Sequence, residues 1–305
     1  MQPIKEEIKW RDPQGNVHTR TQERIFVPSS VFDNQALMEN DPDYVQRLAS
    51  MPEAERKALL YGDWDTFSGQ VFTEWRNDSG HYEDRINTHV IKPFKVPDSW
   101  KIWCGMDWGY SRPFSVLWFA VDHDRRLYLL KEYYGCTGTP NQGVKMEPAA
   151  VAREILRIES EDPNLKGKQI SRVGDPAIWG SQSGESIGDM LERERVYFEK
   201  GENSRLDGKM QMHHRLAFDE EGIPMLYVFD TCKHFIRTVP NLVYDEKHVE
   251  DVDTDGEDHA YDACRMVLME NPIAPPVRKP PEIPAFDPLS ADEPELDRYE
   301  FYRKY

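Results

Sequence analysis

The chain lacks the features that define several large classes of protein. No apolar run in its 305 residues approaches the roughly 18–20 residues that a membrane span needs, and no signal peptide opens it. Its 4 cysteines stand far apart, with no CxxC pair. Neither a zinc ribbon nor a disulfide framework is therefore expected. These absences predict a protein of a reducing cytoplasm that does not enter a membrane.

Positive charge is also scarce. The chain has 38 Lys and Arg against 55 Asp and Glu, which leaves a formal net charge of −17. This balance counts against a protein that coats nucleic acid through bulk electrostatics. The charge balance does not exclude a protein that binds DNA at a local site while cations neutralise its acidic centre.

A nucleotide-binding P-loop is missing as well. No GxxxxGK[ST] pattern occurs, and the nearest Gly-Lys pair, Gly208-Lys209, is followed by methionine. We therefore do not expect this chain to bind ATP in the usual way.

Residues 88–271 contain an ordered series of strand and helix signals. Three apolar runs separated by turn-like segments predict an antiparallel meander, and alternating helix and strand patterns follow. This order predicts an α/β fold with a mixed central sheet and helices on both faces. The predicted strands are Ile102–Gly109, Phe114–Asp122, Leu127–Tyr134, Ile170–Gly174, Val196–Phe198 and Met225–Phe229; the predicted helices are Glu147–Glu159, Ile187–Glu194, Ser204–Phe218, Cys232–Val239 and Glu257–Met269.

Two flanking regions differ in composition from this compact domain. Residues 1–87 are polar and turn-rich, with a helical stretch near Asp43–Leu60, and read as an N-terminal extension or linker. Residues 272–305 are Pro-rich, charged and without periodicity, and read as a flexible tail.

Three acidic residues stand at places where a lone carboxylate is costly. Asp107 lies in an apolar strand signal, Asp175 ends a short strand signal, and Asp262 opens the apolar face of the last predicted helix. Convergence of the three would give hard oxygen ligands for Mg²⁺ or Mn²⁺. Two such ions can stabilise both the entering and the leaving oxygen of a phosphodiester, with Asp107 shared between them.

Simpler interpretations stay open for Asp175 and for the neighbours of this triad. Asp175, just before a proline, is alone most simply a cap or turn residue. His259, one helical turn before Asp262, could orient water or contact the leaving group, but a lone histidine is more often a packing or capping residue. Glu257 and Asp258 most simply complement the dipole of the last helix.

A local excess of positive charge runs from Arg193 to Arg215. Basic residues there recur at helical spacing and predict a face that contacts DNA phosphates without reading bases. A solvated amphipathic face is the competing interpretation. Arg112, close to Asp107 in the sequence, is a further candidate. The DNA-binding candidates are Arg112, Arg205, Lys209, His213 and Arg215.

Several motifs resemble one known family. MDWGY at 106–110, VGDP at 173–176 and EDHAYDACR at 257–265 resemble the nuclease domain of the large terminase subunit of tailed bacteriophages. FVPSSVFDN at 26–34 and LLYGDWD at 59–65 resemble the stretch where that family's ATPase domain ends and its linker begins. The resemblance runs from about Arg24 to Asn271.

This resemblance implies an RNase H-like fold and metal-dependent cutting of concatemeric viral DNA. By it, the catalytic and metal-binding acids are Asp107, Asp175 and Asp262, with His259 as an accessory. Double-stranded DNA, a portal protein, a small terminase subunit and an ATPase domain or chain would be partners in the cytoplasm of an infected bacterium. The missing P-loop indicates an excised nuclease half or one product of a split gene.

Two other functions remain as alternatives. The chain could be a docking module that binds portal or a separate packaging ATPase through its arm and its acidic tail. The same fold could also serve a branched-DNA resolvase or an integrase core. The motifs at 62–65 and 257–265 favour terminase over these last two.

Overall fold

The computed structural model describes residues 4–11, 17–24, 31–34, 41, 43–49, 59–60, 69–180, 184–245, 247–248 and 250–274. Its elements are β1 (Ile4–Arg11), β2 (Val17–Arg24), η1 (Val31–Asp33), α2 (Tyr44–Ala49), η3 (Ser79–His81), β3 (Val90–Ile91), β4 (Lys101–Asp107), β5 (Ser115–Val121), β6 (Leu127–Tyr134), α4 (Pro148–Glu161), β7 (Ile170–Gly174), η4 (Pro176–Trp179), α5 (Ile187–Arg193), β8 (Glu199–Lys200), α6 (Arg205–Leu216), β9 (Leu226–Phe229), α7 (Lys233–Thr238), η5 (Val239–Asn241) and α8 (His259–Glu270). The motif residues 26–30 and 61–65, the loop residues 181–183 and the tail from residue 275 lie outside the described residues.

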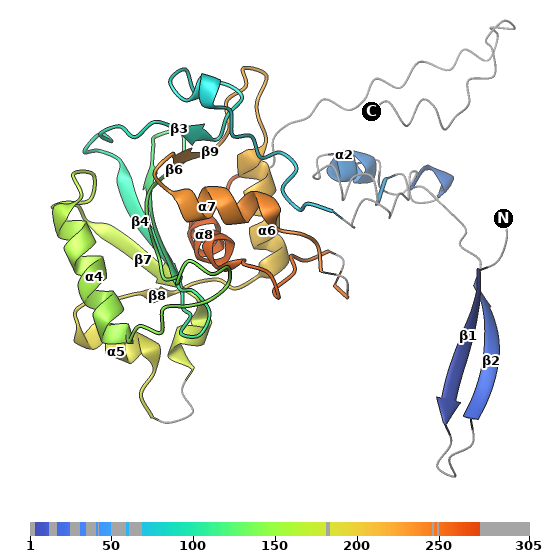
Figure 1. The fold of residues 1–305 in the computed structure, drawn as a ribbon. Coiled ribbons are helices and arrows are strands. Elements are labelled where there is room, and N and C mark those ends of the chain that lie inside the picture. The colour runs from blue at the N-terminus through green and yellow to red at the C-terminus, as the bar shows by residue number, and fades with distance from the viewer. Residues whose placement is uncertain are drawn as a thin grey trace, which may run out of the picture.

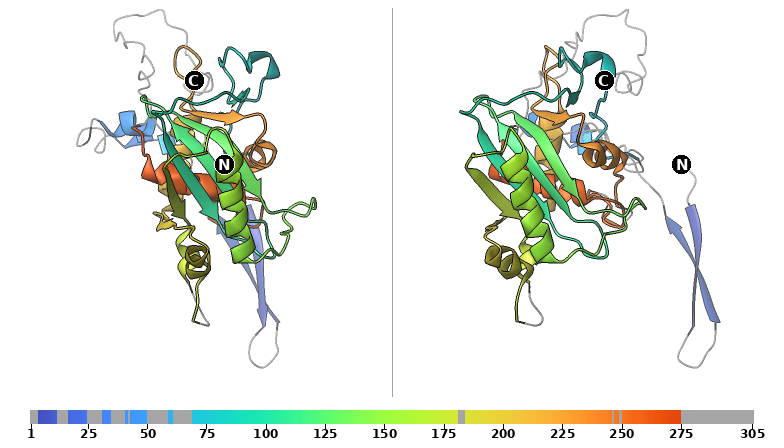
Figure 2. Two further views of the ribbon diagram at one scale, coloured as in Figure 1. Left: turned by 90° about the vertical axis from the view of Figure 1, so that its left-hand side faces the viewer. Right: turned by 60° about the vertical axis from the view of Figure 1, so that its left-hand side comes forward.

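Seven strands form one mixed sheet in the order β3-β9-β6-β5-β4-β7-β8. Strands β4, β5 and β6 are the antiparallel meander that the sequence predicts, and β4 then pairs in parallel with β7. Helices α4 and α5 cover one face, while α6, α7 and α8 cover the other (Figures 1 and 2). The predicted α/β fold with a mixed central sheet and helices on both faces is confirmed.

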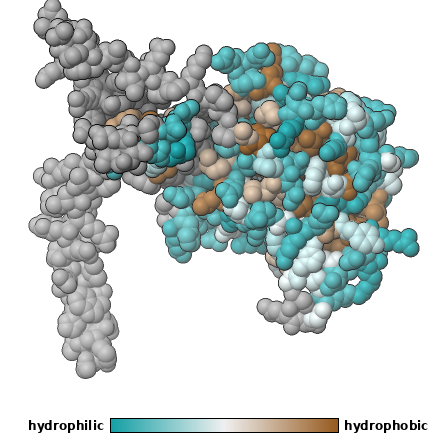
Figure 3. Space-filling view, turned by 180° about the vertical axis from the view of Figure 1, so that it is seen from behind, coloured by the Kyte–Doolittle hydropathy of each residue, from teal (hydrophilic) through white to brown (hydrophobic). Residues whose placement is uncertain are grey.

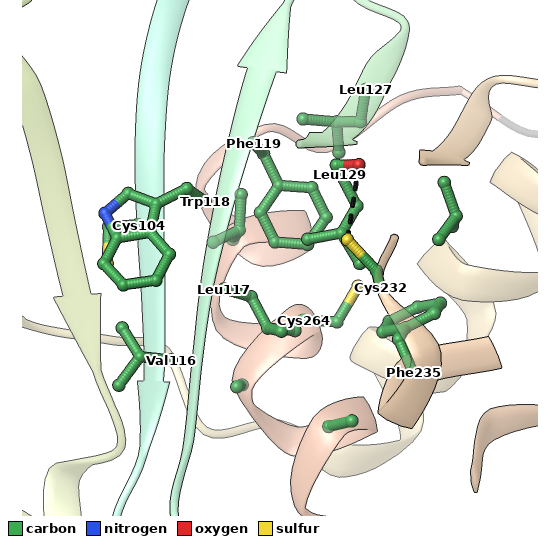
Figure 4. Packing of buried hydrophobic residues seen from close by; sticks show 14 of the residues in the cluster. Cys104, Val116, Leu117, Trp118, Phe119, Leu127, Leu129, Cys232, Phe235 and Cys264 are labelled. Atoms are coloured by element: carbon green, nitrogen blue, oxygen red, sulfur yellow. Dashed lines mark hydrogen bonds between the residues drawn. The ribbon is translucent and has the colours of Figure 1, made fainter. Parts of the chain in front are cut away.

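The core lies on both sides of β5. All seven residues of this strand are buried, because it is an inner strand with a helical layer on each face. Successive side chains point to opposite faces: Leu117 and Phe119 point toward α8, whereas Val116 and Trp118 point away from it (Figure 4). On the α4 face, the Trp118 indole donates to Glu159 at 3.0 Å.

Helix α8 lies unusually close to the central strand β4. A Cβ atom at Gly105 would stand 2.2 Å from the Ala263 carbonyl oxygen and 2.8 Å from Val267 Cγ2. A side chain at this position would therefore push the helix away. On the other side of α8, a Cβ at Gly208 of α6 would stand 2.2 Å from Cγ of Arg265. The two glycines thus allow β4, α8 and α6 to pack closely against one another.

The structure also departs from the predicted elements. The strand expected at Val196–Phe198 forms later, as the two-residue β8, and β3 was not expected. The core includes Val71, Phe72 and Trp75, which precede the expected domain start at residue 88. A two-stranded antiparallel hairpin, β1–β2, lies within the region read as polar and turn-rich.

On the face shown in Figure 3, hydrophobic residues lie scattered among hydrophilic ones. No helix within the described ranges is both long enough and apolar enough to cross a membrane.

Candidate active site

The first two acids meet because two parallel strands end side by side. Met106 of β4 pairs with Gly174 of β7, and the residue that follows each is an aspartate, Asp107 or Asp175. The Asp175 backbone N–H continues this ladder and donates to the Met106 carbonyl at 3.0 Å. The parallel register therefore places both carboxylates at one edge of the sheet.

The third acid arrives on α8. Because Ala263 lies against Gly105, its neighbour Asp262 stands beside the end of β4. One helical turn earlier, His259 Nδ1 lies 3.1 Å from Asp107 Oδ2. The negative charges of Asp262 and Asp175 both act on the pKa of Asp107. The structure thus gathers the three acids and His259 at the same edge.

Each of the three carboxylates is already engaged by a group of the protein. Asp107 pairs with His259; Asp175 caps η4, accepting from the Ala177 N–H at 2.7 Å; Asp262 pairs with Arg265 at 3.1 Å. Within the described ranges, no three His, Cys, Asp or Glu side chains are arranged to hold a single metal ion. Metal binding therefore requires these carboxylates to turn from their present partners.

A fourth carboxylate, Asp258, belongs to the same cluster. It is 4 % exposed and occupies the N-cap position of α8 without a side-chain capping bond. This place at the helix start agrees with a carboxylate that complements the helix dipole, but the side chain is also buried among the other acids. Glu257, by contrast, pairs with Arg237 at 2.6 Å.

Burial and mutual repulsion shift the ionisation of this cluster. Burial is the largest cause that raises the pKa of Asp107 to about 6; the His259 hydrogen bond opposes it, and the negative charge of Asp262 adds to it. Burial, followed by the charge of Asp262, raises the pKa of Asp258 to about 7. Burial lowers the pKa of His259, but the bond to Asp107 and the nearby negative charges outweigh it, so the net pKa is raised.

Two arginines supply fixed positive charge to the acids. Arg205 of α6 donates from Nε to Asp251 at 2.7 Å, lies 3.4 Å from Asp262 and stands 4.0 Å from Asp258. The buried Arg265 donates to Asp262 and, through Nη2, to Asn203 at 2.9 Å. Arg205 was predicted to contact DNA, but its guanidinium is turned to the acids.

Asn141 completes the surroundings of His259. Its side-chain Nδ2 donates to the carbonyls of Asp255 and Gly256, at 3.2 and 3.0 Å. Its Oδ1 therefore faces His259 Nε2, 2.9 Å away, and accepts a hydrogen bond from the ring N–H. Both ring nitrogens of His259 are thus held by polar partners. Nothing in the sequence around Asn141 marked it as part of the site.

The expected phosphate-contacting face of α6 points into the protein. Lys209 is 2 % exposed, donates to the Glu250 carbonyl and lies over the Tyr244 ring at 5.1 Å. His213 bonds Glu74 at 3.0 Å. Arg215 is fully buried and donates to the Arg125 carbonyl at 2.9 Å. The prediction that these three side chains face outward is wrong, because α6 lies between α8 and neighbouring loops.

Arg112 is the DNA-binding candidate that the structure leaves at the surface. It is exposed, lies in the loop after β4, and donates to the Asp255 carbonyl at 3.3 Å. It therefore stands near Asp107 in space as well as in sequence.

The chemistry of this donor set fits divalent cations that prefer oxygen ligands. Four carboxylates stand together at one edge, and two of them have pKa values raised to about 6 and about 7. Positive charge placed among them would relieve that repulsion. Asp107, Asp175 and Asp262 could offer oxygen ligands to such a cation after turning from their present partners.

No family model matches the sequence, and no curated protein matches it. Among solved structures, the fold is similar to that of the large terminase from the thermophilic bacteriophage D6E in complex with ATP-gamma-S. The TM-score is 0.53 at 20 % identity, covering 78 % of this chain and 54 % of that one. A second crystal form of the same terminase gives a TM-score of 0.51.

Two isolated nuclease domains are also similar, more loosely. The P22 large terminase nuclease domain has a TM-score of 0.47 at 19 % identity, over 67 % of this chain and 92 % of that one. The large terminase nuclease from the thermophilic phage G20c with bound cobalt has a TM-score of 0.40 at 10 % identity, over 66 % and 96 %. At these TM-scores neither likeness carries an argument.

The chain spans about half the length of the D6E terminase that it matches. At 20 % identity, this likeness establishes the fold and leaves the activity to be argued from the site. Its structural neighbours are large terminase chains, and the chain has the RNase H-like fold that the sequence resemblance predicted.

Proposed function

We propose that this chain is a metal-dependent endonuclease that cuts concatemeric viral DNA during genome packaging. The observation that carries the proposal is the meeting of Asp107, Asp175 and Asp262 at one edge of an RNase H-like sheet. Strands β4 and β7 deliver the first two acids in register, and α8, whose Ala263 and Val267 lie against Gly105, carries the third. The buried Asp258 belongs to the same group of acids.

Divalent ions bound here would stabilise charge on the attacking and leaving oxygens of a phosphodiester. Asp107, at the end of the central strand β4, would hold these ions together with Asp175 and Asp262. His259 keeps a proton near Asp107 because its pKa is raised. Asn141 fixes the orientation of the same ring, so the proton is held at a defined place.

The experiment is cleavage of supercoiled plasmid in Mg²⁺ or Mn²⁺, comparing wild type with Asp107→Asn. Asp124→Asn is the matched control, because Asp124 is exposed in the β5–β6 turn, at the opposite end of the sheet from Asp107. We expect metal-dependent nicking and linearisation by wild type and Asp124→Asn, with loss in Asp107→Asn. Intact plasmid with wild type, or full activity in Asp107→Asn, would overturn the proposal.

The partners follow from the same proposal. Duplex DNA is the substrate, and a portal protein, a small terminase subunit and an ATPase domain or chain would act with it in the cytoplasm of the infected host. The likeness to about half of the D6E chain supports an associated motor, since that structure contains ATP-gamma-S. Pull-down with portal protein, comparing the chain with one ending at Asn271, tests the docking role separately from cleavage.

A further inference from the structure

Two loops next to the acids lie against each other. One is the loop after β4, residues 108–113, and the other connects β6 to α4, residues 135–147. The Gly143 N–H donates to the Ser111 carbonyl at 2.9 Å, and the Lys145 N–H donates to the Tyr110 carbonyl at 3.2 Å. A Cβ at Gly143 would stand 2.2 Å from the Arg112 carbonyl oxygen. Only glycine permits this approach, so the two loops form one unit, which we call the rim.

The rim is tied to the acid site at two points. Asn141 bonds His259 and the carbonyls of Asp255 and Gly256. From the other loop, Arg112 donates to the same Asp255 carbonyl. The rim therefore keeps a fixed relation to Asp107, and a molecule held by the rim would be presented to the acids.

The side chains that the rim exposes are suited to a nucleic-acid backbone. Tyr110 is 45 % exposed, and Arg112 and Lys145 are both exposed. Within the described ranges, neither cation has a carboxylate at ion-pair distance. Lys145 also has a φ of +55°, a conformation unfavourable for lysine that persists only where its surroundings enforce it.

The basic helix α6 offers no comparable surface, because Lys209, His213 and Arg215 are buried and Arg205 is turned to the acids. We propose that the rim binds the sugar–phosphate backbone of duplex DNA beside the acids. Arg112 and Lys145 contact phosphates, and the Tyr110 ring lies against a sugar. This inference rests on the proposed nuclease function and names the surface that holds its substrate.

The test measures DNA binding apart from cleavage. Fluorescence anisotropy of a short labelled duplex is titrated with the full chain over a series of salt concentrations, in EDTA and again in Ca²⁺. The rim variants are Arg112→Gln and Lys145→Gln. The matched controls are Lys101→Gln, at the opposite end of β4 from Asp107, and Lys166→Gln, in the exposed turn after α4.

Each rim variant should raise the Kd at low salt by roughly tenfold and reduce the slope of log K against log salt by about 1. The controls should match wild type. Tyr110→Ala should weaken binding without changing the slope, because the ring carries no charge, whereas Tyr110→Phe should bind as wild type does.

The outcomes separate this inference from the proposed function. Rim variants that bind DNA as tightly as the lysine controls would overturn the rim assignment, while metal-dependent cutting by wild type would still stand. A wild-type chain that binds duplex through the rim but never cuts it would overturn only the nuclease proposal. Absence of duplex binding by wild type in both conditions would also overturn the rim assignment.

Discussion

Arg205 on α6 places its Nη1 atom 3.4 Å from both carboxylate oxygens of Asp262 on α8. The same guanidinium also forms ion pairs with Asp251 and Asp258, so one cation interacts with three carboxylates. Burial lowers the pKa of Arg205, but the negative charge of Asp262 and the bond to Asp251 together outweigh it, so the pKa is raised above its ordinary value. Arg205 therefore supplies, without a metal, part of the positive charge that the cluster needs.

Replacement of Arg205 by glutamine should make the protein depend on divalent metal. Without the guanidinium, the partly buried acids repel one another, and the metal-free protein should lose about 2–3 kcal/mol of stability. Mn²⁺ should then raise the Tm of Arg205→Gln by more than it raises that of wild type. Differential scanning fluorimetry with and without Mn²⁺ measures both effects. Arg153→Gln, which removes an exposed ion pair with Glu194, is the control; equal Mn²⁺ shifts in all three proteins would contradict this role.

Asp258 should make metal-free stability depend on pH. Its folded-state pKa of about 7 lies above the ordinary value of about 3.8, so the folded protein binds the extra proton. Stability is therefore lost as pH rises from about 4 to about 7. Removing the charge in Asp258→Asn should abolish this loss, which is on the order of 2–4 kcal/mol.

Urea unfolding of wild type and Asp258→Asn at pH 4.5, 6 and 7.5 in EDTA, values spanning that window, measures the difference. The variant should gain stability relative to wild type as pH rises. Asp107→Asn should behave likewise over a narrower range, because the pKa of Asp107 is about 6. A constant difference between variant and wild type at all three pH values would show that these carboxyl groups titrate normally.

Gly105→Ala should disturb the acid site indirectly, by displacing helix α8 from strand β4. The added methyl group would stand 2.2 Å from the Ala263 carbonyl, so α8 must shift and carry Asp262 and His259 with it. We expect a loss of about 1–3 kcal/mol in unfolding free energy together with reduced cleavage. Gly69→Ala, where a Cβ meets nothing within 4 Å, is the control. Wild-type stability in Gly105→Ala would contradict the close approach of helix and strand.

Asn141 should act on cleavage through His259. Asn141→Ala should lower kcat roughly tenfold, as expected when the partner that orients a site histidine is removed. In a His259→Ala background the same substitution should have little further effect, because its target is gone. Cleavage rates of the two single variants and the double variant, at saturating DNA, give the coupling. Independent effects of the two substitutions would mean that Asn141 acts only on the loop.

The order of strands and helices was predictable from the sequence because it depends on local sequence patterns. The meander, α4, β7 and the closing helix show hydrophobic periodicity and turn signals that do not depend on tertiary context. Strand β3 was missed and strand β8 was predicted at the wrong residues, because both short strands depend on tertiary pairing. Strand β8 is the two-residue segment Glu199–Lys200 and exists only through pairing with β7, and β3 pairs only with β9.

Side-chain direction on α6 could not be obtained from charge spacing. Basic residues at helical intervals usually face solvent, and Arg205, Lys209 and His213 follow that spacing. In the fold, the Tyr244 ring receives the Lys209 ammonium and backbone carbonyls receive the Arg215 guanidinium. These partners come from distant segments, so no local pattern distinguishes a buried arginine from an exposed one.

The three acids could be singled out from the sequence because each stands at a strand end or at a helix start, in a recognisable order. Asp258 and Asn141 were not, because their roles arise from contacts. Asp258 occupies an ordinary N-cap position and becomes unusual only when packing buries it near Asp262. Asn141 lies in a polar loop, and its link to His259 spans 118 residues of sequence.

The most direct test of the account is anomalous scattering from crystals soaked in Mn²⁺. The account predicts Mn²⁺ peaks bound by Asp107, with Asp175 and Asp262 turned from Ala177 and Arg265 to join it. Mn²⁺ bound only elsewhere on the protein, or no peak at this edge of the sheet at saturating Mn²⁺, would contradict the claim that these acids form a metal centre.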